Sequence, residues 1–313
     1  MSRSAFRSTR RQLLGTGLTA LIGGTGAACV LAAAEPAPKI ITKAIPSTGE
    51  RLPAIGLGTD AFYRSEQAAI RAEIERMVEL GGTVVDTSSD YGDSEALIGE
   101  ALAATGLRGR LFLATKLTAG GGLFGMGVGG EASFHRSLQR LRTDRVDLLQ
   151  VHNLDGTDTL LPLMQRWKQA GQTRYIGVTV SVGWQHDAIA RTMRRYPLDF
   201  IQVDYSIDDR DAERVIFPTA LERGVAVLVN LPLGRASLIS RARGKALPPW
   251  AAELAISSWS QFFLKYVISH PAVTCAIPGS TKVVHLQDNQ LAAREPLPDA
   301  AARGRMERYW ASL

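Results

Sequence analysis

The sequence predicts an α/β protein whose core is a (β/α)8 barrel preceded by a β-hairpin. Three observations support this fold class. Short apolar segments, many of them rich in β-branched residues, alternate with segments of helical periodicity. Eight strand segments of this kind can be counted after the hairpin, which is the number that a (β/α)8 barrel requires. They occupy roughly 250 residues, the usual size of that fold.

The elements follow one another in a regular order. A hairpin is predicted first, because KIITKAI and RLPAIGLGT flank a Ser-Thr-Gly turn. The strand segments are AIGLGT (54–59), TVVDT (83–87), LFLATK (111–116), VDLLQVH (146–152), YIGVT (175–179), FIQVD (200–204), VAVLVN (225–230) and VTCAIP (273–278). Residues 65–80 have helical spacing and end at Gly81-Gly82. The last 17 residues, LPDAAARGRMERYWASL, predict a closing helix.

The alternative fold class is a doubly wound open sheet. It is disfavoured because no G-x-G-x-x-G follows the first strand. The glycine-rich segment AGGGLFGMGVGG (119–130) follows the third strand and has different spacing. We interpret it as a mobile active-site loop, and an ordinary flexible loop is the alternative. The long connection 231–250 is expected to cover the active site.

The first 34 residues predict an export signal, which leaves residues 35–313 as the barrel domain. Four arginines precede an apolar run that ends in Ala32-Ala33-Ala34, and this stretch has no acidic residue. The pair Arg10-Arg11 directly before the apolar run resembles a twin-arginine signal, so its expected partner is the twin-arginine export machinery. A periplasmic or exported location follows. The alternative is an N-terminus that stays uncleaved and anchors the protein.

Charge and cysteine content exclude several classes of protein. The net charge is +6, but the four arginines of the N-terminal segment account for most of it and leave +2 for the remainder. The high pI is therefore no sign of nucleic-acid binding. Cys29 lies in the predicted signal, and Cys275 would be alone in the mature chain within an apolar strand. Neither a disulfide nor a cysteine-rich metal site is expected there.

Ionisable side chains stand where three successive strands end. Asp86 closes the second strand, with Tyr91 in the loop after it. Lys116 closes the third strand and His152 the fourth. Because the carboxyl ends of barrel strands meet at one mouth, these four side chains are expected to converge there.

The types of these residues predict proton transfer to an oxygen. A lysine ammonium beside a tyrosine lowers the pKa of the phenol, whose ordinary value near ~10 is high for exchange at neutral pH. Asp86 would keep Lys116 charged and oriented. His152 would position a carbonyl oxygen or relay its proton. Each residue alone also has a structural explanation, as a cap, a solvated charge or a packing group, and the joint pattern favours a site.

The motifs that surround these residues resemble a known family. IGLGT, VVDTSSDYGDSEALIG, LFLATK, DRVDLLQVH, RYIGVT, DFIQVDYS and IPGSTKVVHLQDN occur in the order seen in aldo-keto reductases. The resemblance covers residues 43–313. It implies that Tyr91 is the general acid, that Lys116 tunes it, that Asp86 supports Lys116 and that His152 orients the substrate.

The resemblance also implies NADPH as the hydride source, with NADH as the alternative, lying across the barrel mouth. The positions that match the family's cofactor contacts are Thr179, Gln202, Gly234, Ser237, Leu238, Ser280, Thr281, Lys282, His285, Asp288 and Asn289. Gln202 would bond the nicotinamide amide, the 234–238 loop would approach the pyrophosphate, and residues 280–282 would hold the 2′-phosphate.

Several positions depart from the family pattern. Thr179-Val180 replaces a Ser-Asn pair at the nicotinamide, and Asn230 replaces the aromatic residue that stacks on it. Gly279 and His285 stand where a Lys and an Arg commonly hold the 2′-phosphate, so Lys282 is expected to compensate.

Three functions are therefore weighed. The first is an NADP(H)-dependent oxidoreductase that reduces a small aldehyde or ketone or oxidises the alcohol. The second is an exported barrel that binds a ligand without turnover. The third is non-redox acid/base chemistry by the same residues. A metal hydrolase is not expected, because the five histidines have no metal-ligand spacing.

Overall fold

The structure, a computed structural model, describes residues 39–120 and 130–313. An eight-stranded parallel sheet forms the centre, with strand order β10-β9-β8-β7-β6-β5-β4-β3. The strands are β3 (Leu57–Gly58), β4 (Val84–Asp86), β5 (Phe112–Leu117), β6 (Val146–Val151), β7 (Thr173–Thr179), β8 (Phe200–Asp204), β9 (Ala226–Asn230) and β10 (Val273–Ala276). Each observed strand overlaps its predicted segment, and the bounds differ by at most three residues at either end.

Bridges between the first and last strands close the sheet into a barrel. Gly56 N donates to Ala276 O (2.8 Å) and Gly58 N donates to Pro278 O (3.0 Å). A Cβ at position 58 would lie 2.7 Å from the Ile277 carbonyl oxygen, so only glycine permits this approach. The predicted barrel is confirmed.

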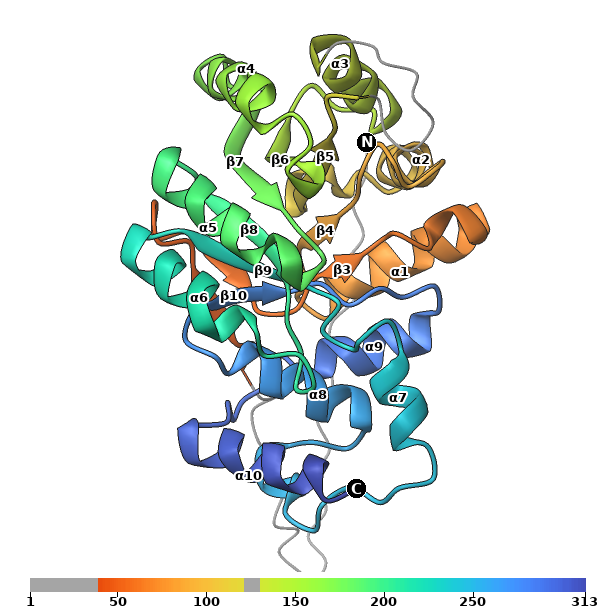
Figure 1. The fold of residues 1–313 in the computed structure, drawn as a ribbon. Helices are drawn as coiled ribbons and strands as arrows, with labels where there is room; N and C mark the ends of the chain where they lie inside the picture. The colour runs from red at the N-terminus through yellow and green to blue at the C-terminus, as the bar shows by residue number, and fades with distance from the viewer. Residues whose placement is uncertain (1–38, 121–129) are drawn as a thin grey trace, which may run out of the picture. The chain divides into compact units, whose positions relative to one another are not determined.

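Helices alternate with the strands and surround them (Figure 1). They are α1 (Gln67–Glu79), α2 (Ser94–Thr105), α3 (Gly130–Arg140), α4 (Thr157–Gln169), α5 (His186–Arg195), α6 (Ala212–Arg223), α7 (Ser237–Ala242), α8 (Trp259–Ile268), α9 (Val283–Leu291) and α10 (Ala300–Ala311). The amphipathic pattern explains their packing: α1 buries Ile70, Ile74 and Met77 against the barrel. The predicted glycine stop is present, since Gly81, which follows the C-cap residue Leu80 of α1, has φ +88°.

The predicted N-terminal hairpin consists of β1 (Thr42–Ala44) and β2 (Arg51–Pro53), which pair antiparallel. Its residues Ile45 and Leu52 are buried with the apolar side chains that fill the barrel. The larger core cluster is made mostly by helix residues and the other strand residues. The hairpin therefore helps to seal the apolar interior.

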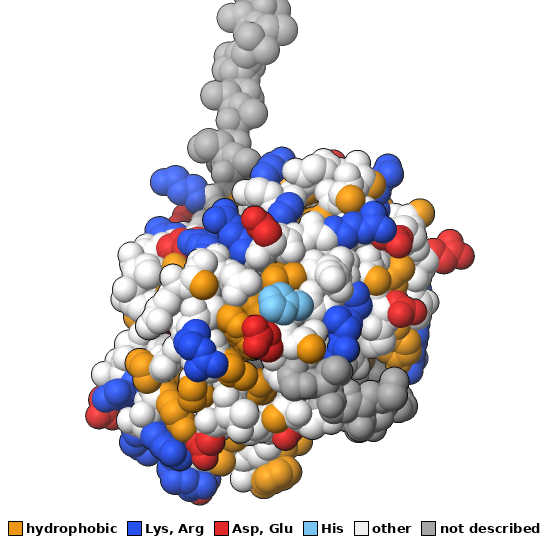
Figure 2. Space-filling view, turned by 90° about the horizontal axis from the view of Figure 1, so that it is seen from above, with side chains coloured by type: hydrophobic (Ala, Val, Ile, Leu, Met, Phe, Trp, Pro, Cys, Tyr) orange, Lys and Arg blue, Asp and Glu red, His pale blue; other side chains and the backbone are white. Residues whose placement is uncertain are grey.

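The long connection 231–250 contains the short helix α7, and the predicted closing helix is α10. The predicted export signal lies outside the described residues, and so does most of the glycine-rich segment, residues 121–129. Within the described ranges, no helix is long and apolar enough to cross a membrane. On the face seen in Figure 2, basic and acidic side chains are interspersed, so that face carries no field of one sign.

Candidate active site

Asp86 and Lys116 form a buried ion pair at the carboxyl ends of β4 and β5. Lys116 Nζ lies 2.5 Å from Asp86 Oδ2 and donates to Thr87 O at 2.9 Å. Both side chains are almost inaccessible, with exposures of 0% for Lys116 and 2% for Asp86. A charge pair this deep is stable only if its remaining hydrogen-bonding capacity is also satisfied.

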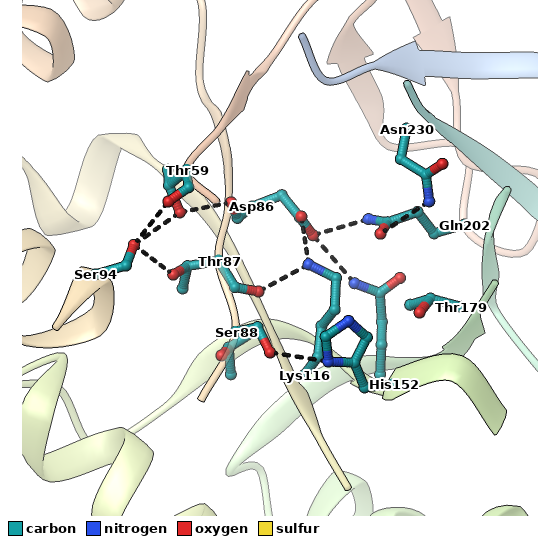
Figure 3. Close-up of polar contacts among 12 residues, drawn as sticks. Thr59, Asp86, Thr87, Ser88, Ser94, Lys116, His152, Thr179, Gln202 and Asn230 are labelled. Atoms are coloured by element: carbon teal, nitrogen blue, oxygen red, sulfur yellow. Dashed lines mark hydrogen bonds and ion pairs between the residues drawn. The ribbon is translucent and has the colours of Figure 1, made fainter. Parts of the chain in front are cut away.

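Two glutamines complete the surroundings of Asp86 (Figure 3). Gln150 Nε2 of β6 donates to Asp86 Oδ1 at 3.2 Å. Gln202 Nε2 of β8, labelled in Figure 3, donates to the same oxygen at 2.9 Å. Asp86 thus accepts hydrogen bonds from three strands. The carboxylate and the ammonium are fixed in place by this network.

Tyr91 lies in the turn after β4, where its amide donates to Ser88 O (3.2 Å). Lys116 Nζ lies 4.8 Å from the centre of the phenol ring. Burial raises the pKa of Tyr91, and the positive charge of Lys116 opposes that rise without cancelling it. Lys116 therefore acts to lower the pKa of Tyr91, as expected, but the net shift of that pKa is upward.

Burial acts to lower the pKa of Lys116, but the charges of Asp86 and Tyr91 outweigh it and leave the pKa above its ordinary value. Lys116 is consequently protonated at neutral pH. The expectation that Asp86 keeps this lysine charged is consistent with the geometry.

His152 follows β6 and faces the same site. Its ring makes an edge-to-face contact with Tyr91, with ring centres 5.8 Å apart. Its Nδ1 lies 3.1 Å from Asp90 Oδ2 and 3.2 Å from Ser88 Oγ. The structure thus brings all four predicted catalytic side chains together.

A pocket of about 740 Å³ opens over these residues. Asp86, Tyr91 and His152 line one part of it, while Lys116 lies below its floor. The lining also includes Thr179, Gln202 and Asn230 from β7, β8 and β9, and Ser280, Thr281 and His285 from the segment after β10. This size is ordinary for a small-molecule or cofactor site.

The predicted cofactor positions divide into two groups. Thr179, Gln202, Ser280, Thr281 and His285 line the pocket. The others do not line it: Gly234, Ser237, Leu238, Lys282, Asp288 and Asn289.

The surroundings of three of these positions bear on whether they can contact a cofactor. Asp288 is engaged by Ser258 Oγ and Gln261 Nε2, both at 2.7 Å, which ties α9 to α8. The Ser280 hydroxyl lies 2.7 Å from Glu73 Oε1. Lys282 is exposed.

The residues that depart from the family pattern interact with one another. Asn230 Nδ2 donates to Val180 O (2.9 Å) and lies 3.5 Å from Gln202 Oε1. Gln202 is therefore engaged at both ends of its amide, and only one of its N–H groups is left to serve a ligand. Asn230 Oδ1 is buried without a partner among the described residues.

The sequence reasoning missed four residues of the site. Gln150 bonds Asp86, Asp90 bonds His152, and Arg64 and Arg235 line the pocket. Gln150 was detectable as a lone amide within an apolar strand, and Asp90 as the acid directly before Tyr91. Arg64 ends a short 3-10 helix after β3 and Arg235 stands in the loop after β9, and the sequence does not reveal the direction of either side chain. No group of three His, Cys, Asp or Glu residues in the described part of the chain is arranged to hold a metal.

Left-handed backbone at non-glycine residues is concentrated around this pocket. Asn153 (φ +52°), Leu231 (φ +53°), Arg235 (φ +52°) and Ala236 (φ +68°) all line it. Each such residue costs about 1–3 kcal/mol and persists only where the surroundings enforce it, typically at binding and catalytic sites. The pocket is therefore a built feature of the loops after β6 and β9.

A closed parallel barrel with a buried Asp–Lys pair, a tyrosine and a histidine at its mouth defines a class of barrel oxidoreductases. Comparison with known proteins agrees: the model of the family described as "Aldo/keto reductase family" matches residues 54–303. This chain belongs to that family.

Similar proteins support the same assignment. "Aldo-keto reductase str7" of Strobilurus tenacellus is 27% identical over 285 residues, which cover 76% of this chain and 80% of that protein. An aldo-keto reductase of Klebsiella pneumoniae, solved with NADP and acetate, is 26% identical, with a TM-score of 0.63 over 84% of this chain and 93% of that one. The holo form of AKR11C1 from Bacillus halodurans has a TM-score of 0.71 at 23% identity, over 86% of this chain and 96% of that one, and this likeness concerns the fold alone.

Proposed function

We propose that this protein is an NADP(H)-dependent oxidoreductase that interconverts a small aldehyde or ketone and its alcohol, with Tyr91 as the general acid/base. The observation that carries the proposal is the buried Lys116–Asp86 pair, whose ammonium lies 4.8 Å from the centre of the Tyr91 ring that lines the pocket. The Klebsiella pneumoniae relative, solved with NADP and acetate, supports the choice of cofactor.

The residues of this chain fit such a cofactor. The pocket extends from Tyr91 and His152 to Ser280, Thr281 and His285, and Arg64 and Arg235 also line it. Neither arginine has an acidic partner among the described residues, so both are free to face phosphate groups. When bound, NADPH would supply the hydride that adds to the carbonyl carbon.

The side chains would handle the proton. In reduction, the Tyr91 hydroxyl donates its proton to the carbonyl oxygen, which becomes the alcohol hydroxyl. The Lys116 ammonium stabilises the phenolate that remains, and Asp86 holds the ammonium in place. Because burial raises the pKa of Tyr91, the phenol stays protonated at neutral pH and is ready to donate. In alcohol oxidation the same proton moves in the opposite direction.

The test combines nucleotide binding with turnover of a panel of aldehydes. Titration with NADPH should quench the intrinsic tryptophan fluorescence. Tyr91→Phe should lose at least about a thousandfold in kcat/KM, roughly 4 kcal/mol, while it still binds NADPH. Tyr309→Phe, which removes the hydroxyl of a half-buried tyrosine on α10 that does not line the pocket, is the matched control. Undiminished turnover in Tyr91→Phe would contradict the proposed role of Tyr91 as the general acid/base.

The 2′-phosphate position is tested by comparing nucleotides. If Lys282 carries it, Lys282→Ala should weaken NADPH binding by one to two decades, the cost of about 1.5–3 kcal/mol for a charged hydrogen bond, and leave NADH binding unchanged. An equal effect on both nucleotides would assign the 2′-phosphate to another residue.

A second function is kept because Gln202, Val180 and Asn230 bond one another at the predicted nicotinamide position. Under it, the barrel binds a ligand or performs non-redox acid/base chemistry. Turnover of any substrate by protein stripped of nucleotide would favour this function over the first.

For residues 1–34 we keep the proposal of twin-arginine export. Sequencing the N-terminus of the protein recovered from the periplasm checks it. Replacing Arg10 and Arg11 by lysine should hold the protein in the cytoplasm, and periplasmic protein in that variant would contradict the proposal.

A further inference from the structure

An acidic residue stands directly before the proton donor and contacts the histidine of the site. Asp90 Oδ2 lies 3.1 Å from His152 Nδ1. Both side chains are partly shielded from solvent, with exposures of 21% for Asp90 and 13% for His152. Neither the family resemblance nor the chemistry of the Tyr91–Lys116 pair gives Asp90 a role.

The contact decides which ring nitrogen carries a proton. A carboxylate accepts hydrogen bonds and donates none, so His152 Nδ1 must carry a hydrogen. Ser88 Oγ, 3.2 Å from the same nitrogen, is a second acceptor for that hydrogen. Ser88 Oγ also accepts from the amide of Asp90 (3.2 Å), which fixes serine, aspartate and imidazole in one turn.

The other ring nitrogen, Nε2, is then the one available to the pocket that His152 lines. In the neutral ring it is an acceptor, suited to the hydroxyl of an alcohol. In the charged ring it is a donor, suited to a carbonyl oxygen, and Asp90 supplies the opposite charge.

We propose that Asp90 is a positioning residue for the reaction, which sets the tautomer and the orientation of His152 so that Nε2 meets the substrate oxygen. The inference rests on the proposed oxidoreductase function. One short loop thus supplies both the proton donor, Tyr91, and the partner that orients the second group on the same oxygen. Asp90 itself need not touch the substrate.

Three variants separate this role from a structural one. Asp90→Ala removes the acceptor, and Asp90→Asn keeps an acceptor oxygen but removes the charge. Asp93→Asn makes the same charge change three residues away, at the start of α2, where the side chain is exposed and makes no capping hydrogen bond. Thermal unfolding of each variant confirms that it is folded.

The direct readout is the ¹⁵N spectrum of the imidazole in histidine-labelled protein, with the His152 signals assigned by their absence in His152→Gln. In the wild type, the neutral ring should be protonated at Nδ1. In Asp90→Ala, Ser88 Oγ becomes free to donate to Nδ1, and the ring should change to the form protonated at Nε2. Asp93→Asn should keep the wild-type spectrum.

Kinetics should follow the same order. Loss of a charge-assisted hydrogen bond at Asp90→Ala should lower kcat/KM by about 10- to 100-fold, with NADPH affinity unchanged. Asp90→Asn should lie between that variant and the wild type. Unchanged ring signals together with unchanged kcat/KM in Asp90→Ala would overturn the inference.

The proposed function can fail separately. If the wild type neither binds nucleotide nor turns over a carbonyl, the oxidoreductase proposal is wrong. The ring spectra of the wild type and Asp90→Ala would still show whether Asp90 sets the tautomer of His152. A wild-type ring protonated at Nε2 alone would refute the inference whatever the activity.

Discussion

The two ends of the barrel interior differ sharply although the same strands build both. The amino-terminal part is apolar and is filled by residues such as Phe112, Leu148 and Phe200 under the hairpin residue Leu52. Two or four positions further along the same strands stand Lys116, Gln150 and Gln202, bonded to one another through Asp86.

This arrangement follows from strand geometry. Side chains two residues apart on a strand point to the same side, so each strand presents successive layers to the interior. On β5 the inward sequence is Phe112, Ala114, Lys116, and on β6 it is Leu148, Gln150. Successive layers along the same strands therefore serve different roles: one packs the core and the next forms the site. Mutations at the apolar end should change stability, and mutations at the polar end should change activity.

The largest expected effect is that of Lys116→Met at the polar end. It should abolish turnover and lower the free energy of unfolding by about 3–5 kcal/mol, because Asp86 is left buried without its counter-ion. Urea unfolding and the aldehyde assay measure the two effects. Lys168→Met, which breaks the partly exposed pair with Asp199, is the control and should cost less than about 1 kcal/mol. Equal losses of unfolding free energy in the two variants would show that burial of the ion pair does not determine the cost of breaking it.

At the apolar end, Phe200→Ala should lower the free energy of unfolding by about 3–5 kcal/mol through the cavity it leaves. Turnover by the folded fraction should stay close to that of the wild type, although Gln202 of the site is only two residues away. Urea unfolding and kcat/KM at low temperature check this pair of outcomes. A loss of kcat/KM comparable to that in Lys116→Met would show that the two ends are not separable.

A smaller effect is expected at a polar pair that lies beside the mouth but does not line the pocket. His186 Nε2 lies 3.1 Å from Asp204 Oδ1, and both side chains are buried. The hydrogen bond to Asp204 raises the pKa of His186 above its ordinary value, despite the opposing effect of burial. The folded state therefore binds this proton more tightly than the unfolded state does.

The stabilisation from His186 is complete below the unfolded pKa, near 6.5, and is lost as pH rises through the higher folded pKa. The difference in the free energy of unfolding between wild type and His186→Gln should be about 1.5–3 kcal/mol near pH 5.5 and should shrink toward pH 9. Unfolding curves across this range measure it. His135→Gln, on the exposed face of α3, is the matched control for the substitution itself. A difference that grows with pH would reverse the assigned sign.

Sequence alone was sufficient to predict the alternation of strands and helices and the proximity of the four side chains, for a physical reason. Apolar, β-branched segments of 5–7 residues that alternate with segments of helical periodicity are compatible with few folds. In a parallel barrel the carboxyl ends of the strands lie at the same mouth. Asp86, Lys116 and His152 could therefore be placed together without coordinates.

The remainder of the site depends on side-chain directions that no residue pattern specifies. Asp90 reaches His152, and Arg235 reaches the pocket, because of loop dihedrals such as the φ of +52° at Arg235 itself. The direction of the net pKa shift at Tyr91 was missed for a similar reason: it depends on the extent of burial, which only the packed structure defines.

The smallest effect is expected at Cys275, at the apolar end of the barrel, where we expect no alkylation of the native protein. This thiol is fully buried among the apolar side chains inside the barrel, and burial raises its pKa, so very little thiolate forms. Iodoacetamide at pH 8 should leave the Cys275 peptide unmodified in the native protein, as read by mass spectrometry, and should label it fully in urea. In Phe200→Ala, labelling should become measurable, because the lower free energy of unfolding raises the population of open states. Rapid labelling of the native wild type would mean that solvent reaches the apolar end. The two ends of the barrel interior would then differ in residue type but not in solvent accessibility.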